Sequence, residues 1–163
     1  MFVVGIIGVL ATIAVPRLVS ARNSATVAAA IATMRTLGTA QLSFAISCGN
    51  GFYAPDLPAL AKVPIGSSVG FIGGEFSVGP TIVRQNFTIQ MAGTAFAGAP
   101  DTCNAIGPNV GAQAFKAGAD PIDPTIPRFF AINALSVVYE DIASLYAGMP
   151  ESAIPASGHP VNR

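Results

Sequence analysis

Charged side chains are scarce in this chain. Asp, Glu, Lys and Arg together make up 10% of its 163 residues, whereas ordinary soluble domains contain roughly 25%. Eight basic residues balance eight acidic ones, so no basic surplus is left to neutralise phosphates, and a general nucleic-acid-binding function is excluded. An apolar fraction of 52% also excludes a disordered chain. Part of the chain therefore fits an environment other than water.

Histidine and cysteine are equally rare. His159 is the single histidine, and the two cysteines, Cys48 and Cys103, form no Cys-x-x-Cys motif, so a zinc site lacks ligands. A reactive thiol needs a positive neighbour or a base, and neither cysteine has one nearby in the sequence. In an exported chain this pattern predicts a structural Cys48–Cys103 disulfide. A disulfide that closes a loop of this length would stabilise the fold by about 4 kcal/mol, because it lowers the entropy of the unfolded chain.

The sequence contains only weak candidates for a catalytic site. A Ser-His-Asp site would have to recruit His159 from a proline-rich tail. Two carboxylate pairs are present, Asp120/Asp123 in a Pro-rich turn and Glu140/Asp141 at the end of a predicted strand. Both have ordinary structural explanations, because turns favour Asp and charges at strand ends are commonly solvated. A membrane-anchored exported enzyme is kept as an alternative, but the sequence favours a protein with no catalytic activity, cofactor or metal.

The first fifteen residues carry no charge. As a helix they span about 23 Å, short of the roughly 30 Å of a bilayer's hydrocarbon core. A cleaved secretory signal peptide is one alternative, and Val19-Ser20-Ala21 resembles a cleavage site, but no basic segment precedes the apolar run. A single-pass anchor for a periplasmic domain is another alternative.

Residues 17–46 continue the apolar run as an Ala-rich helix candidate. Apolar residues recur there at helical spacing and define one face. The face comprises Val27, Ile31, Met34, Leu42 and Ala45, broadened by Leu37 and Phe44. Together the two stretches predict one helix of about 45 residues, about 68 Å long, which ends at Gly49-Asn50-Gly51. We predict that a sheet covers this face.

The rest of the chain has loop and strand patterns. Residues 52–80 contain many Pro and Gly and predict a connecting loop with a short helical turn near 56–62. Strands are predicted at 82–91, 110–119, 128–133 and 136–140, the last two joined tightly through Ala134-Leu135. The tail, residues 148–163, is predicted to be a loosely held strap. The fold class is therefore α+β, a long N-terminal helix packed against a small antiparallel sheet.

Residues 2–16 read Phe-Val-Val-Gly-Ile-Ile-Gly-Val-Leu-Ala-Thr-Ile-Ala-Val-Pro. This segment resembles the N-terminal segment of type IV pilins and pilin-like proteins, in which Ile-Ile-Gly-Ile-Leu-Ala leads into Ile-Ala-Ile-Pro. The matching residues are Ile6, Ile7, Gly8, Leu10, Ala11, Ile13, Ala14 and Pro16, with Val9 and Val15 as conservative departures. Residues 129–140 look like the last hairpin of bacterial pilin heads. The Pro-Trp motifs of the major secretion pseudopilins are missing, so the resemblance favours a pilus subunit over a type II secretion pseudopilin.

The resemblance implies a structural subunit that polymerises with itself into a helical, extracellular pilus filament for adhesion or motility. The stem, residues 1–24, would lie in the inner membrane before assembly and in the filament core afterwards, and residues 25–163 would form the globular head. The pilus assembly machinery is the other expected partner. The residues expected in the filament core are Phe2, Val3, Val4, Gly5, Ile6, Ile7, Gly8, Val9, Leu10 and Ile13.

The resemblance also bears on the two ends of this apolar segment. The family carries a methylated N-terminal residue and a glutamate that would both precede Met1, so we expect the upstream codons to encode a short basic leader ending in Gly and then an apolar hexapeptide containing Glu. Gly8 and Pro16 bound the stretch least suited to a helix, because Pro lacks an N–H and Gly has low helix propensity. We predict that this stretch is helical in lipid and partly extended in a filament.

Overall fold

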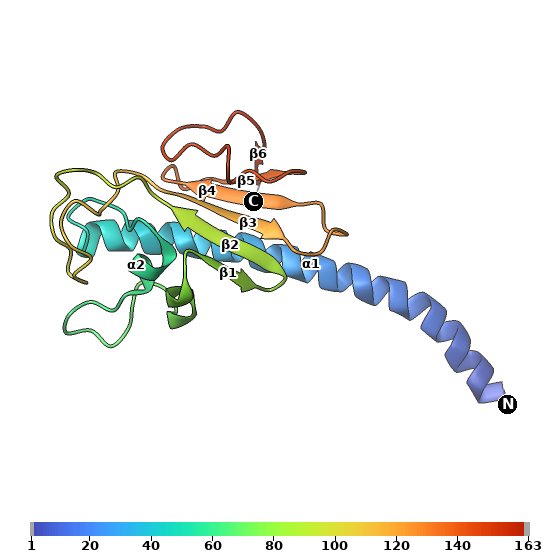
Figure 1. The fold of residues 1–163 in the computed structure, drawn as a ribbon. Coiled ribbons are helices and arrows are strands. Elements are labelled where there is room, and N and C mark those ends of the chain that lie inside the picture. The colour runs from blue at the N-terminus through green and yellow to red at the C-terminus, as the bar shows by residue number, and fades with distance from the viewer. Residues whose placement is uncertain (1, 162–163) are drawn as a thin grey trace.

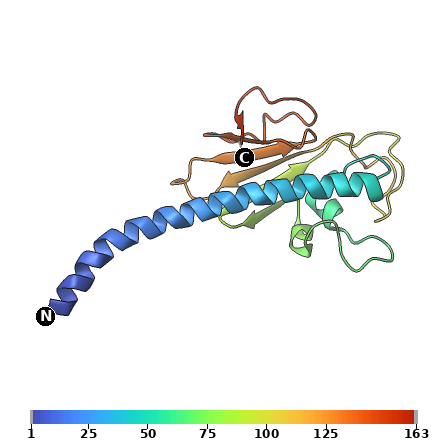
Figure 2. The same ribbon diagram turned by 180° about the vertical axis from the view of Figure 1, so that it is seen from behind.

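The computed structural model describes the backbone of residues 2–161 and the side chains of residue 3 and residues 17–161. Helix α1 (Phe2–Ser47) contains 46 residues, close to the length that the apolar pattern predicts. Its C-terminal half lies against a sheet, and its N-terminal half projects away from the rest of the chain (Figures 1 and 2). Residues 27–161, which include the packed part of α1, are called the body below.

Polar side chains on the described part of α1 bond to the helix itself. Ser and Thr hydroxyls donate to the carbonyl oxygen four residues earlier at distances of 2.7–3.1 Å; the donors are Ser24, Thr26, Thr33, Thr36, Thr39 and Ser47. These bonds satisfy the hydroxyls locally. The helix ends where Asn50 and Gly51 adopt positive φ angles of 50° and 92°, and the Gly51 N–H donates to the Ala45 carbonyl at 2.8 Å.

The described residues form one six-stranded sheet in which each strand pairs antiparallel with the next in sequence. The strands are β1 (Thr81–Arg84), β2 (Phe87–Ala92), β3 (Lys116–Pro121), β4 (Phe129–Asn133), β5 (Val138–Asp141) and β6 (His159–Pro160). Helix α2 (Leu57–Ala61) and the 3₁₀ turn η1 (Gly74–Val78) lie in the connection between α1 and β1. The structure is therefore α+β, as predicted, and α2 confirms the predicted helical turn.

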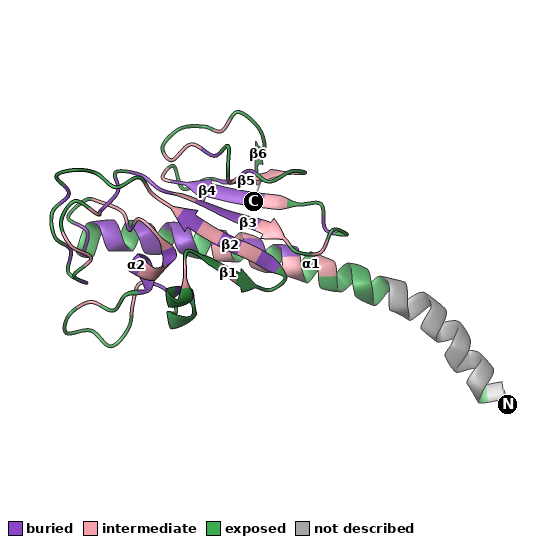
Figure 3. Ribbon diagram, in the orientation of Figure 1, coloured by how far each residue is buried: buried purple, intermediate pink, exposed green. Residues whose placement is uncertain are grey.

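The core lies between α1 and one face of the sheet, where Figure 3 shows both elements buried. Met34, Leu37 and Phe44 are at most 1% exposed on the helix, and strand β2 contributes its alternate residues Phe87, Ile89 and Met91. Strand β4 adds Phe130 and Ile132. Full burial of each such side chain contributes about 1.5–3 kcal/mol, so this contact dominates the stability of the body.

The predicted helix face is largely correct, with one error. Val27, Met34 and Ala45 are buried and Ile31 is half-buried, but Leu42 is 48% exposed. Leu37 and Phe44, which the pattern gave only as a broadening of the face, lie at its centre. Leu42 instead lines an open groove beside Gly38 and Ile132.

Two predicted strands have different bounds. Residues 82–91 form a hairpin, because Gln85 and Asn86 take φ angles of 49° and 66° and turn the chain between β1 and β2. The strand predicted at 110–119 begins only at Lys116, since the preceding residues form an irregular loop with isolated bridges to Tyr53 and Ala95. The predicted terminal hairpin is confirmed by the pairing of β4 with β5.

The tail is held more firmly than predicted. The Asn133 amide donates to the carbonyls of Pro150 and Ala153 at 2.9 and 2.7 Å, and the Glu151 carboxylate accepts from the Thr94 hydroxyl at 2.8 Å. Leu145 and Met149 are buried in a second small cluster with Ala131 and Tyr139. The tail therefore covers part of the sheet face opposite α1.

No helix among the described residues is both long enough and apolar enough to cross a membrane.

Candidate functional site

The structure joins Cys48 to Cys103 by a disulfide with the Cα atoms 4.8 Å apart, which confirms the predicted pairing. Cys48 follows the last residue of α1, and Cys103 lies in the long connection between β2 and β3. The Cys103 N–H donates to the Cys48 carbonyl at 3.2 Å, and the Asn50 amide donates to the Asp101 carbonyl at 3.1 Å. Covalent and hydrogen bonds together fasten the end of the helix to this loop.

A buried amide, Gln41, was missed by the sequence reasoning. Gln41 is 0% exposed; its Oε1 accepts from the Ala54 N–H at 2.9 Å and its Nε2 donates to the Ala54 carbonyl at 2.8 Å. Both backbone groups of Ala54 are thereby satisfied inside the core. The signal was its spacing, four residues after Leu37 and four before Ala45, which places a polar residue on the buried stripe.

The projecting part of α1 is exposed where its side chains are described. All of residues 17–22 are exposed, including Leu18 at 70% and Val19 at 55%, and Val3 is 68% exposed. The other residues predicted for the filament core or the helix break lie outside those whose side chains are described: Phe2, Val4, Gly5, Ile6, Ile7, Gly8, Val9, Leu10, Ile13 and Pro16. Arg17 and Arg22 follow this segment, and no acidic residue occurs before Asp56.

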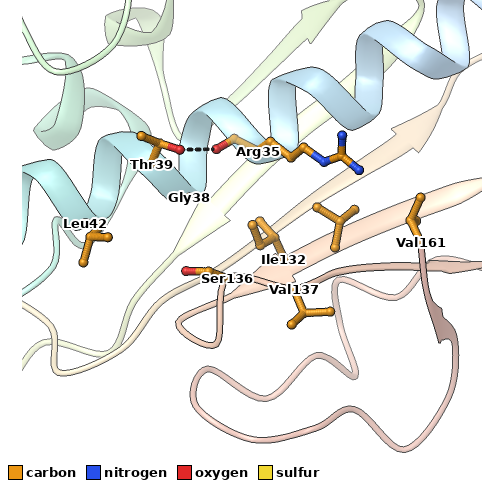
Figure 4. A pocket seen from close by; sticks show the side chains of 9 residues that line it. Arg35, Gly38, Thr39, Leu42, Ile132, Ser136, Val137 and Val161 are labelled. Carbon is orange, nitrogen blue, oxygen red and sulfur yellow. Dashed lines mark hydrogen bonds between the residues drawn. The ribbon is translucent and has the colours of Figure 1, made fainter. Parts of the chain in front are cut away.

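A groove of about 430 Å³ lies between α1 and strands β4 and β5 (Figure 4). Its residues are Arg35, Gly38, Thr39, Leu42, Ile132, Ser136, Val137, Val138 and Val161. Gly38 lets the helix approach β4 closely, since a Cβ there would stand 2.8 Å from Cδ1 of Ile132. Arg35, the one charged residue of the groove, extends from α1 toward the side where Val161 lies. The groove therefore combines aliphatic side chains, the hydroxyl residues Thr39 and Ser136, and a single cation at its edge.

Two other arginines of the described body are held in ion pairs. Within the described residues, Arg84 pairs with Glu75, and Arg128 pairs bidentately with Glu140, the second bond measuring 2.7 Å. The hydrogen bond and charge of Arg128 hold the pKa of Glu140 below its ordinary value. Arg35 takes part in neither pair, so its guanidinium remains available to an acidic group from outside.

The carboxylates considered for catalysis have structural contacts. The Thr125 hydroxyl and N–H donate to Asp123 at 2.7 and 2.8 Å and hold its pKa below the ordinary value. Asp120 accepts from the Ser144 hydroxyl at 2.7 Å. His159 lies opposite Glu140 in the β5–β6 pairing. Over the part of the chain described, no three His, Cys, Asp or Glu side chains are placed to hold a metal ion.

Comparison with protein-family models, curated proteins and solved structures finds no match to this chain.

Proposed function

We propose that this chain is the structural subunit of an extracellular filament of the type IV pilus kind, with a pilin fold. One observation carries the proposal: a single helix begins in the pilin-like apolar segment, projects from the body, and then passes beneath an antiparallel sheet. Among the side chains that the structure describes, the first buried on this helix is Val27, whereas residues 17–22 are all exposed. This exposed segment is therefore left to contact something other than its own body.

The physical chemistry of the projecting segment favours assembly. An apolar helix has two acceptable environments, lipid and a bundle of like helices, and exchange between them exposes little apolar surface to water. Gly5 and Gly8 would let neighbouring stems approach closely. Contacts that join different surfaces of successive copies do not close on themselves and extend into a filament. Under this proposal the partners are further copies of the chain, the inner membrane before assembly, and the assembly machinery.

The disulfide supports export. Disulfides persist in oxidising compartments and are rare in reducing ones, and Cys48–Cys103 closes a separation of 55 residues at the end of the body farthest from the projecting helix. A surface filament with a membrane-anchored precursor pool meets that condition.

The experiment is electron microscopy of sheared surface material from cells that express the full gene. We expect filaments that contain this chain by mass spectrometry and immunogold labelling, that disappear on gene deletion and return on complementation. A chain found only as a membrane-anchored monomer, with no filaments, contradicts the proposal and favours the anchored-domain alternative. Short fibres that form only on overproduction favour the secretion pseudopilin.

A further inference from the structure

We propose that the groove bearing Arg35 receives the Asp141–Ile142 corner of a second copy of this chain. The proposal rests on the filament function above and names one contact between neighbouring subunits. The groove calls for an occupant that combines an aliphatic side chain, for the floor around Gly38 and Ile132, with a carboxylate for Arg35.

Few acidic residues of the chain meet that requirement. Glu75 and Glu140 are held in ion pairs, Glu151 accepts from Thr94, and Asp56 accepts from the Ala59 N–H at the start of α2. Asp101 lies between Pro100 and Thr102 in the sequence, so no large aliphatic residue adjoins it. Asp120 is half-buried and accepts from the Ser144 hydroxyl. The remaining pairs combine a half-buried acid with an exposed isoleucine next to it, and they are Ile122–Asp123 and Asp141–Ile142.

Asp141–Ile142 fits the groove better than Ile122–Asp123 does. Ile142 is 81% exposed, whereas Ile122 is 50% exposed. The Asp123 carboxylate is occupied by two bonds from Thr125, while Asp141 accepts from the N–H of its own neighbour, Ile142, at 2.7 Å. The Asp141 carboxylate therefore keeps lone pairs for an incoming guanidinium.

The topology of the sheet places the Asp141–Ile142 corner and the groove at different positions along strand β5 of the same body. Val138 lines the groove, and Asp141 stands three residues further along the same strand, about 10 Å away. Asp141 pairs with Phe129, whose neighbour Arg128 lines a pocket with Val27, so the corner lies toward the projecting end of α1. The contact thus joins two different surfaces of two copies, displaced along the helix, and each copy keeps one of the two surfaces for a further neighbour.

The first test is a charge exchange in the full-length chain, read as filament mass per cell. Arg35→Glu and Asp141→Lys each place like charges together, and we expect each to lower filament yield at least about tenfold. The combined variant should restore it. Arg22→Glu is the matched control, because Arg22 lies exposed on the same helix outside the groove; Asp141→Lys should not rescue any loss that Arg22→Glu causes.

The second test uses small substitutions that spare the fold. Thr39→Cys with Ile142→Cys should produce a ladder of disulfide-linked multimers on non-reducing gels of sheared filaments, because the contact repeats from copy to copy. Each single variant should give no ladder. The native cysteines do not interfere, since they are already paired.

The outcomes separate the two proposals. Filaments of normal yield from Arg35→Glu, or the absence of a ladder from the double-cysteine filaments, overturn the groove contact and leave the filament function standing. A cross-linked dimer without higher bands also overturns it, because a dimer reports a closed two-fold contact. If the charge variants are degraded in cells, the cysteine pair decides. Absence of wild-type filaments overturns the filament function itself.

Discussion

Helix α1 has one secondary structure and two kinds of support. Its packed part buries Met34, Leu37 and Phe44 under the sheet, whereas Leu18 and Val19 on its projecting part are exposed. Isolated helices are marginal in water, and most helical stability in proteins comes from the packing of one face. The free energy of unfolding that a substitution removes should therefore depend on whether the residue lies on the packed or on the projecting part, although both parts are helical.

The largest contrast between the two parts is expected from a buried charge. Met34→Asp places an unpaired carboxylate in the apolar contact and should lower the free energy of unfolding by about 4 kcal/mol or more. Leu18→Asp, on the projecting part, should change it by less than about 0.5 kcal/mol. Chemical unfolding of the detergent-solubilised full chain, followed by circular dichroism, measures both. A normally stable Met34→Asp protein would show that the packed face is wrongly placed.

The disulfide is the next feature that separates the packed end of the helix from the projecting end. Replacing both Cys48 and Cys103 by Ser should lower the free energy of unfolding by about 4 kcal/mol and expose residues 94–111 to protease. The same denaturation experiment and limited proteolysis measure the two effects. Alkylation of the native protein without reductant is the check: two modified thiols would rule the bond out.

A smaller effect is expected from the buried amide of the packed part. Gln41→Ala leaves the N–H and carbonyl of Ala54 without partners in the core, and should cost about 1–3 kcal/mol. Thr39→Ala, two residues away on the exposed side, removes a hydroxyl that bonds only to its own helix and should cost less than about 0.5 kcal/mol. Equal losses from the two substitutions would mean that Gln41 has no special part in the core.

The smallest effect concerns pH. The folded-state pKa of Glu140 lies below its ordinary value of 4.5 because of Arg128, so the stability that the ion pair contributes is fully present above that value and is lost as pH falls through the folded pKa. Since Arg128 is partly exposed, the contribution is at most about 1 kcal/mol. Wild-type protein should lose more stability than Glu140→Gln between pH 6 and pH 3. Identical losses would argue against the pair.

Periodicity and composition were enough to predict the long helix, most of its buried face, the disulfide and the last hairpin. The hairpin at Gln85–Asn86 escaped, because glutamine rarely adopts positive φ and the flanking residues all favour strands. The anchoring of the tail escaped too, since Asn133 and Glu151 act on partners far away in sequence. The groove at Arg35 escaped as well, because the role of Gly38 in it depends on the close approach of β4 to the helix. Local sequence patterns predict local structure, whereas these three features depend on the three-dimensional arrangement of the chain.

The strand order has a consequence for how the body is made. Every strand pairs with the one before it, and the two hairpins β1–β2 and β4–β5 close over short sequence separations, which are the low-contact-order steps that form fast. The helix that the sheet covers is synthesised first, whereas its partner Phe130 follows Met34 by 96 residues. At translation rates of about 5–20 residues per second, the apolar face of α1 stays uncovered for roughly 5–20 seconds. During that interval the nascent chain is bare along its future core, and delivery to a membrane or a chaperone in that window would shield it from aggregation.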